Sequence, residues 1–116
     1  MTKILFVCSS NVNRSTTAEH IYANRPGLEV KSAGVLPDAR TPVTEELLNW
    51  ADVILVMHKT HLHAIEQKFA AYLDRRTIDC LHVSSVFWYM HPMLIEKITK
   101  KVDAWLSKYQ SDEVQI

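Results

Sequence analysis

The stretch Cys8-Ser9-Ser10-Asn11-Val12-Asn13-Arg14-Ser15 joins the apolar run Ile4-Leu5-Phe6-Val7, of strand length, to a segment with helical periodicity. A short polar loop between a buried strand and a helix is the usual place for a phosphate-binding turn in an α/β sheet. Its backbone N–H groups can point at an anion, and the helix N-terminus adds partial positive charge. The stretch therefore predicts an α/β fold with an anion site after the first strand.

Cys8 and Arg14 give this loop its chemistry. An arginine offers a planar fork to two phosphate oxygens, and a cysteine beneath the phosphorus can act as the nucleophile. An electropositive loop also favours the reactive thiolate form of the cysteine. The alternative is a small buried cysteine that ends a strand, with Arg14 in solvent at a helix start. The predicted phosphate-binding residues are Ser9, Ser10, Asn11, Val12, Asn13 and Arg14.

Composition and charge exclude several classes of protein. Of the 116 residues 47% are hydrophobic and 22% charged, as in ordinary soluble domains, and 13 basic residues balance 13 acidic ones. Without a basic excess, nonspecific nucleic-acid binding is disfavoured. No apolar segment is long enough for a membrane span or a signal peptide, so we expect a cytoplasmic protein. The residues show no metal-ligand spacing; the pair His61 and His63 is expected on a solvated helix surface.

Strand and helix patterns alternate along the chain. Strands are predicted at residues 3–7, 28–33, 53–57 and 77–83, with helices after Ser15, after Thr41-Pro42, over residues 59–73 and from Pro92. This alternation with short connections predicts a three-layer α/β/α fold with a four-stranded parallel sheet. We expect a single domain over residues 1–110 and a flexible tail at 111–116.

Several motifs together suggest a family. The stretch VCSSNVNRSTTAE resembles the signature of the low-molecular-weight protein tyrosine phosphatases, in which a short strand leads into C-x5-R-S and a helix. The segments at 32–34 (Ser-Ala-Gly), 37–40 (Pro-Asp-Ala-Arg) and 50–52 (Trp-Ala-Asp) are also similar to that family. Length and residues 89–92 (Tyr-Met-His-Pro) look most like its compact bacterial subgroup. The resemblance implies a Rossmann-like fold of the phosphotyrosine phosphatase I type.

The resemblance also implies roles for single residues. Cys8 corresponds to the phosphoenzyme nucleophile, Arg14 to the phosphate clamp, and Ser15 to the hydroxyl that donates to the thiolate. Asn11 matches the asparagine that holds the turn of the loop, with Ser32 as its neighbour. This chain departs from the family in two places of the loop.

Many family members carry glycine at the position of Ser10 and a second cysteine at the position of Asn13. The asparagine removes the possibility of a protective disulfide inside the loop.

A larger departure concerns the general acid. The family protonates the leaving group with an aspartate before the last helix, yet no carboxylate stands between Asp79 and Glu96. Ser85 occupies the acid position in one alignment register and His91 in the other. A serine cannot act as the acid at neutral pH, so His91 is the predicted acid. The alternative for His91 is a helix-start residue on the rim of the site. Aromatic residues at 87–89 are predicted to wall the pocket or to pack on the sheet edge.

Two functions from different classes follow. The first is hydrolysis of phosphotyrosine-like monoesters through a Cys8 phosphoenzyme, without metal or cofactor. The alternative is a binding module for phosphate or phosphoproteins with little turnover. An arsenate-reductase-like activity ranks lower, because it needs further redox cysteines and only Cys80 is present. The expected partners are a phosphorylated protein or small aryl phosphate and inorganic phosphate, not nucleic acid or membrane.

Overall fold

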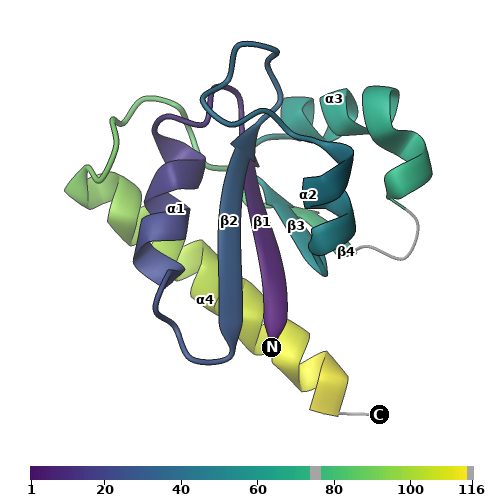
Figure 1. Ribbon diagram of the computed structural model, residues 1–116. Coiled ribbons are helices and arrows are strands. Elements are labelled where there is room, and N and C mark those ends of the chain that lie inside the picture. The colour runs from purple at the N-terminus through teal and green to yellow at the C-terminus, as the bar shows by residue number, and fades with distance from the viewer. Residues whose placement is uncertain (74–76, 115–116) are drawn as a thin grey trace.

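A four-stranded parallel sheet in the order β2-β1-β3-β4 forms the centre of the computed structural model, which describes residues 1–73 and 77–114, with side chains described up to residue 109 (Figure 1). The elements are β1 (Thr2–Cys8), α1 (Arg14–Tyr22), β2 (Leu28–Gly34), α2 (Glu45–Trp50), β3 (Val53–Val56), α3 (Lys59–Phe69), a 3-10 turn (Ala70–Tyr72), β4 (Thr77–Cys80) and α4 (Pro92–Val114). The strands lie between helices, and the predicted three-layer α/β/α architecture with a parallel sheet is confirmed.

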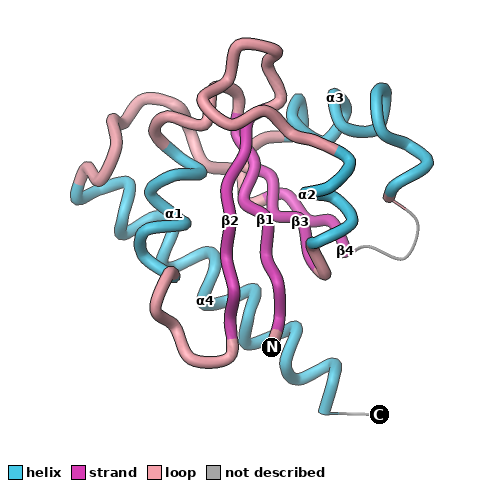
Figure 2. Tube along the Cα trace, in the orientation of Figure 1, coloured by secondary structure: helices cyan, strands magenta, loops and turns pink. Residues whose placement is uncertain are grey.

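Helices cover both faces of the sheet (Figure 2), and each face carries its own apolar core. Alternate residues of β1 point to opposite faces, so Ile4 and Phe6 pack against α1 and α4, whereas Leu5 and Val7 pack against α2 and α3. Both sets are fully buried, as a continuous apolar run in a parallel sheet predicts. The carboxyl ends of the paired central strands β1 and β3 therefore lie side by side at one end of the sheet.

Helix α2 begins later than the sequence predicts. Pro42 does not open the helix; it forms a parallel bridge with Gly34, and the N–H groups of Gly34 and Val43 bond to the carbonyls of Thr41 and Gly34. These bonds keep residues 41–43 extended alongside the end of β2. The cap is Thr44, whose hydroxyl accepts from the Leu47 N–H.

The fourth strand is shorter and the last helix longer than predicted. Strand β4 ends at Cys80 because His82 has φ of 56°, which breaks the extended conformation. Helix α4 runs to Val114, four residues into the segment predicted as a tail, since residues 111–114 contain no glycine or proline to end it. Residues 115–116 lie outside the described part; the single-domain boundary and the tail's flexibility stay predictions.

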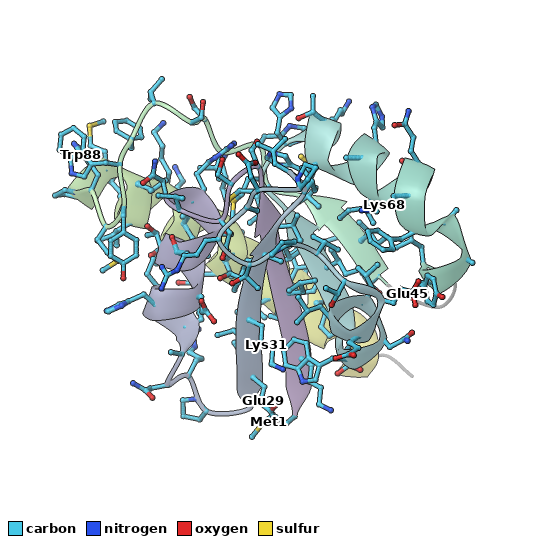
Figure 3. The ribbon with its side chains drawn as sticks, turned by 45° about the horizontal axis from the view of Figure 1, so that its top comes forward. Met1, Glu29, Lys31, Glu45, Lys68 and Trp88 are labelled. Atoms are coloured by element: carbon cyan, nitrogen blue, oxygen red, sulfur yellow. The ribbon has the colours of Figure 1, made fainter. Side chains whose placement is uncertain are left out.

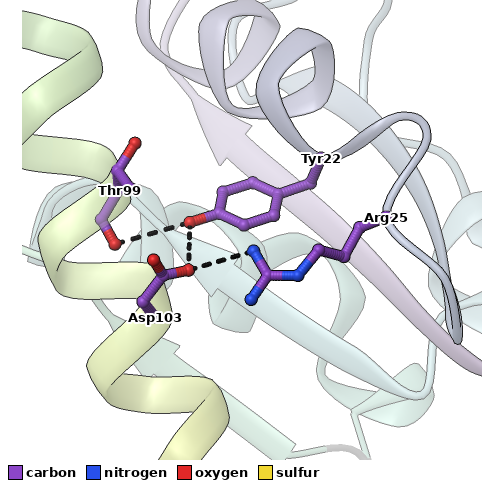
Figure 4. A network of polar contacts seen from close by, with 4 residues as sticks. All are labelled: Tyr22, Arg25, Thr99 and Asp103. Carbon is purple, nitrogen blue, oxygen red and sulfur yellow. Dashed lines mark hydrogen bonds and ion pairs between the residues drawn. The ribbon is translucent and has the colours of Figure 1, made fainter.

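A polar network ties α1 to α4 on the same face of the sheet (Figure 4). The Tyr22 hydroxyl donates to Asp103 Oδ1 at 2.8 Å and to the Thr99 carbonyl at 3.4 Å, and Arg25 Nη1 lies 3.2 Å from the same carboxylate oxygen. Burial and the Asp103 carboxylate raise the pKa of Tyr22, so its hydroxyl remains a donor. This network holds the C-terminal end of α1. The first turn of α1 adjoins the loop of residues 9–13, the predicted anion site, here called the anion loop. Within the described residues, no helix has the length and hydropathy to cross a membrane.

Candidate active site

The loop between β1 and α1 orients a hydroxyl group toward the Cys8 sulfur. Asn11 has φ of 57° and is buried, and its Nδ2 donates to Ser15 Oγ at 2.8 Å. Ser15 Oγ lies 2.9 Å from Cys8 Sγ. Because Ser15 Oγ already accepts from Asn11, its own proton is free to donate to the sulfur. Ser15 thus lies in the first turn of α1 with its hydroxyl directed at the Cys8 sulfur, and the N-cap position of the helix is taken by Asn13.

Arg14 is the first residue of α1 and is buried at the floor of the site. Its Nη1 donates to the carbonyl of Val83 at 3.0 Å, which fixes the guanidinium between the anion loop and the segment after β4. Burial lowers the pKa of Arg14 from its usual value, and the nearby Cys8 charge opposes that shift. Arginine stays charged at working pH, so the loop keeps a fixed cation with donors left for phosphate oxygens.

Gly34 lets the end of β2 approach the back of the anion loop. A Cβ atom there would lie 2.5 Å from the Ser9 carbonyl oxygen, 2.7 Å from Ala39 Cβ and 2.9 Å from the Asn11 nitrogen. Two of these three atoms belong to the backbone of the loop itself. The loop therefore takes its shape partly from a glycine that is distant in sequence.

Replacing Gly34 by alanine is expected to destabilise the protein by about 1–3 kcal/mol, as overpacking does, and to weaken phosphate binding because the loop must shift. Urea unfolding and calorimetric titration with inorganic phosphate measure the two effects. Gly27→Ala is the control: Gly27 has φ of 84° but nothing within 4 Å, so the substitution strains only the turn and should leave phosphate affinity unchanged. Equal phosphate affinities for wild type and Gly34→Ala would contradict the prediction.

The prediction that His61 and His63 lie on a solvated helix surface is wrong for His61, which is buried. His63 is exposed, as expected. Its Nε2 lies 2.9 Å from Ser9 Oγ, and its Nδ1 accepts the backbone N–H of His58 at 3.1 Å. Burial first, then the charges of Arg14 and His58, lower the pKa of His61 to about 4. The ring is therefore neutral near pH 7.

Two adjoining cavities open near the carboxyl ends of the strands. The smaller, about 230 Å³, lies over the loop and is lined by Cys8, Ser9, Ser10, Val12, Asn13, Arg14 and Ser85. The larger, about 590 Å³, shares three of these residues; it is lined by Ser9, Arg14, His58, Thr60, His61, His82, Val83, Ser84 and Ser85. Among the described residues, neither lining includes a carboxylate. The site is thus a small polar cradle next to a wider polar space.

Ser32 lies behind the loop, as the sequence suggested, but its hydroxyl donates to Glu19 Oε1 at 2.7 Å. It shares with Asn11 the wall of a third hollow of about 630 Å³, which Cys8 does not line. Neither Cys8 nor Arg14 lines this hollow. The candidate site is therefore the smaller cavity, lined by Cys8 and Arg14, together with the wider cavity that Arg14 also lines.

His91 caps the last helix and does not line either cavity. Its Nδ1 accepts the backbone N–H of Met93 at 3.0 Å, and its ring centroid lies 4.8 Å from that of Phe87 and 4.3 Å from that of Trp88. Trp88 projects at the periphery and is 66% exposed (Figure 3). Of the two possible acid positions, Ser85 lies at the cradle and His91 at the start of α4.

The segment after β4 is fastened to the first turns of α1. The Tyr89 N–H donates to Asn13 Oδ1 at 3.0 Å, and the Met90 N–H donates to Thr17 Oγ1 at 2.9 Å. Met90 itself has φ of 60°. Asn13 therefore has a structural partner that sequence reasoning did not identify. In the described part of the chain, no three histidine, cysteine or acidic side chains are placed to hold a metal ion.

Comparisons with known proteins agree with this geometry. No protein-family model matches the chain. The curated protein-arginine-phosphatase of Bacillus subtilis (strain 168) is 33% identical over 99 aligned residues, covering 62% of this chain and 66% of the relative. The match thus spans slightly less than two thirds of the length of that relative.

Solved structures cover nearly the whole chain. YwlE arginine phosphatase from Geobacillus stearothermophilus superposes with a TM-score of 0.75 at 23% identity, covering 99% of this chain and 97% of that one. The low molecular weight protein tyrosine phosphatase SP-PTP from Streptococcus pyogenes gives 0.76 at 16% identity, covering 93% of each. The Drosophila arginine phosphatase DARP gives 0.73 at 20% identity, covering 96% and 99%.

Fold and site together define a class of α/β proteins in which the first strand leads through a cysteine-to-arginine anion loop into the first helix. Within that class, the chain is similar to the low-molecular-weight protein tyrosine phosphatases and to the protein-arginine-phosphatases. The predicted resemblance to the tyrosine phosphatase family is thereby confirmed, and the roles of the single loop residues stay predictions.

Proposed function

We propose that this chain hydrolyses phosphate monoesters of the phosphotyrosine type through a covalent intermediate on Cys8. The thiolate attacks phosphorus, an S–P bond forms, and the bond from phosphorus to the leaving oxygen breaks. Water then attacks the phosphocysteine, the S–P bond breaks, and inorganic phosphate and the thiolate are released. Each step transfers the same phosphoryl group, so no cofactor or oxidant is needed.

One observation carries the proposal: Cys8 Sγ lies 2.9 Å from an oriented Ser15 hydroxyl, at the base of a cavity that Arg14 also lines. The hydroxyl stabilises the thiolate, and the guanidinium offers paired donors to the phosphoryl oxygens. A YwlE variant with serine in place of its active-site cysteine carries phosphate on that serine, which supports phosphoryl transfer at the corresponding position.

The absence of a carboxylate from the described linings bears on the choice of substrate. A phenol of pKa about 10 leaves faster, by about 10²–10⁴-fold, when a general acid protonates it. We therefore expect good turnover of activated aryl esters and slow turnover of unactivated ones. Without any turnover, the same cradle would act as a phosphate-binding module. Cys80, on the edge strand β4, lines neither cavity, so the arsenate-reductase-like alternative ranks lowest.

Release of nitrophenol from para-nitrophenyl phosphate tests hydrolysis, and calorimetry with inorganic phosphate tests binding. We expect turnover well above the rate without protein, with phosphate as a competitive inhibitor. Binding with no turnover would reject hydrolysis and support the binding module. Neither binding nor turnover would reject both functions.

Phosphoarginine is a second candidate substrate, because the 33% identical curated relative is a protein-arginine-phosphatase. Guanidine departs from phosphorus without a negative charge, which suits a site without a carboxylic acid. The described residues that line the cavities, however, include no carboxylate to pair with the guanidinium. Values of kcat/KM for two peptides of identical sequence, one with phosphotyrosine and one with phosphoarginine, decide between the two substrates.

Replacing His91 by asparagine tests whether this residue is the general acid. Asparagine retains a cap acceptor for the Met93 N–H but cannot donate a proton as an acid. Because the described linings omit His91, we expect the ratio of rates for good and poor leaving groups to match that of the wild type. His91→Ala, which also removes the cap, should lower the melting temperature. Slowing by His91→Asn confined to poor leaving groups would instead identify His91 as the acid.

A further inference from the structure

The hydrogen bonds of His61 fix which of its ring nitrogens carries the proton. The backbone N–H of His58 can only donate, so Nδ1 of His61, at 3.1 Å from it, must accept and is unprotonated. The neutral ring therefore carries its proton on Nε2. That nitrogen lies 2.9 Å from Ser9 Oγ, so Nε2 donates and the hydroxyl oxygen accepts.

The Ser9 hydroxyl then has its own proton available for another acceptor. Ser9 is the residue after the nucleophile, and it lines both the cradle above Cys8 and the wider cavity that contains His61. We propose that His61 is a positioning residue, which orients the Ser9 hydroxyl so that it donates to an oxygen of the phosphoryl group held by the loop. This role rests on the proposed function of the same site.

The same arrangement occurs on the other side of the loop. Asn11 Nδ2 donates to Ser15 Oγ, which leaves the Ser15 proton for Cys8 Sγ. His61 Nε2 donates to Ser9 Oγ in the same way. In each case a buried nitrogen donor occupies the acceptor site of a serine and thereby directs its proton. The Ser15 hydroxyl is directed at the nucleophile Cys8, and the Ser9 hydroxyl is directed at the bound anion.

Burial explains why the donor is an imidazole in its neutral form. His61 is 2% exposed, and its burial, together with repulsion from the positive charges of Arg14 and His58, lowers its pKa to about 4. A neutral ring with Nδ1 blocked has a single donor, which faces Ser9. The orientation of the hydroxyl is thus the same throughout the pH range in which a phosphatase of this kind would work.

Two substitutions of His61 test the hydrogen bonds of its two ring nitrogens separately. In His61→Asn, the amide oxygen takes the place of Nδ1 and keeps the bond to the His58 N–H, but the side chain no longer reaches Ser9. In His61→Gln, the amide nitrogen takes the place of Nε2 and can still donate to Ser9. We expect His61→Asn to raise the Kd for inorganic phosphate about tenfold, as loss of one hydrogen bond to a charged group does, and His61→Gln to restore much of the affinity.

A double-mutant cycle shows whether His61 acts through Ser9. Ser9→Ala alone should weaken phosphate binding about tenfold, and His61→Asn in the Ser9→Ala background should have no further effect. An unchanged Kd in Ser9→Ala overturns the inference even if the His61 variants fail to fold. Equal weakening by His61→Asn in both backgrounds also overturns it, because the effect would then be general.

Nitrogen-15 NMR of the wild-type imidazole tests the tautomer on which the inference rests. The proton of His61 should be found on Nε2 at pH 7, and a proton on Nδ1 would overturn the inference. No phosphate binding by the wild type rejects the proposed function and with it this role. Phosphate binding that depends on Arg14 but not on Ser9 or His61 rejects the inference alone.

Discussion

Replacing Cys8 by alanine is expected to abolish turnover of para-nitrophenyl phosphate, lowering kcat by more than about 10⁴-fold, as loss of a covalent nucleophile does. Affinity for inorganic phosphate should stay the same or rise, because the negative charge beneath the anion is removed while the loop and Arg14 remain. Rates of nitrophenol release and calorimetric titration measure the two effects. Alanine is preferable to serine, since a serine at this position accepts phosphate in a YwlE variant.

Cys80→Ala is the matched control for Cys8→Ala. Cys80 is half-buried at the end of β4 and lines neither cavity, so its removal should leave kcat unchanged. Substantial turnover by Cys8→Ala would show that another group, or water attacking directly, performs the chemistry. Loss of activity in both variants would show that thiol oxidation or instability, rather than the position of Cys8, controls the rate.

Replacing Arg14 by lysine is expected to lower kcat/KM by about 10²–10³-fold even though the formal charge is kept. The guanidinium holds the Val83 carbonyl at 3.0 Å and still has donors for two phosphoryl oxygens, whereas an ammonium is a compact point charge without that fork. Both KM and kcat should change, because the phosphoryl group is bound in the ground state and in the transition state.

Arg25→Lys is the control for Arg14→Lys, since it makes the same chemical change at an exposed arginine paired with Asp103. Pairs of this kind contribute little, so activity should be unchanged and unfolding free energy should shift by less than about 1 kcal/mol. Equal kcat/KM for Arg14→Lys and wild type would contradict the bidentate role. A lower melting temperature for Arg14→Lys is expected, because the tie between the loop and Val83 is lost.

Much of the fold could be predicted because its signals are local. The apolar runs at 4–7 and 53–57 have the length and composition of strands buried on both faces, and they lie in β1 and β3. The anion loop was recognisable from one short segment for the same reason. The start of α2 was not predictable from Pro42, since the bridge to Gly34 depends on where β2 ends in space.

The residues around the loop were harder to predict. His61 carries no sequence signal that separates it from His63, because its burial arises only when the first turn of α3 packs beside Ser9. Likewise, the sequence places Ser85 at the acid position in one register and His91 in the other, and it favours His91 on chemical grounds alone. Only the course of the chain after β4 distinguishes them, placing Ser85 at the cradle and His91 at the helix cap.

The two bonds that fasten residues 89 and 90 to α1 have a consequence for how a substrate enters. Asn13 and Thr17 accept the backbone N–H groups of Tyr89 and Met90, so the segment after β4 is anchored to the same helix that begins with Arg14. Residues 89 and 90 are therefore tied to the first turns of α1 at two points. A phosphorylated side chain that approaches the proposed site past this segment would meet a stretch of chain anchored to α1, not a free loop.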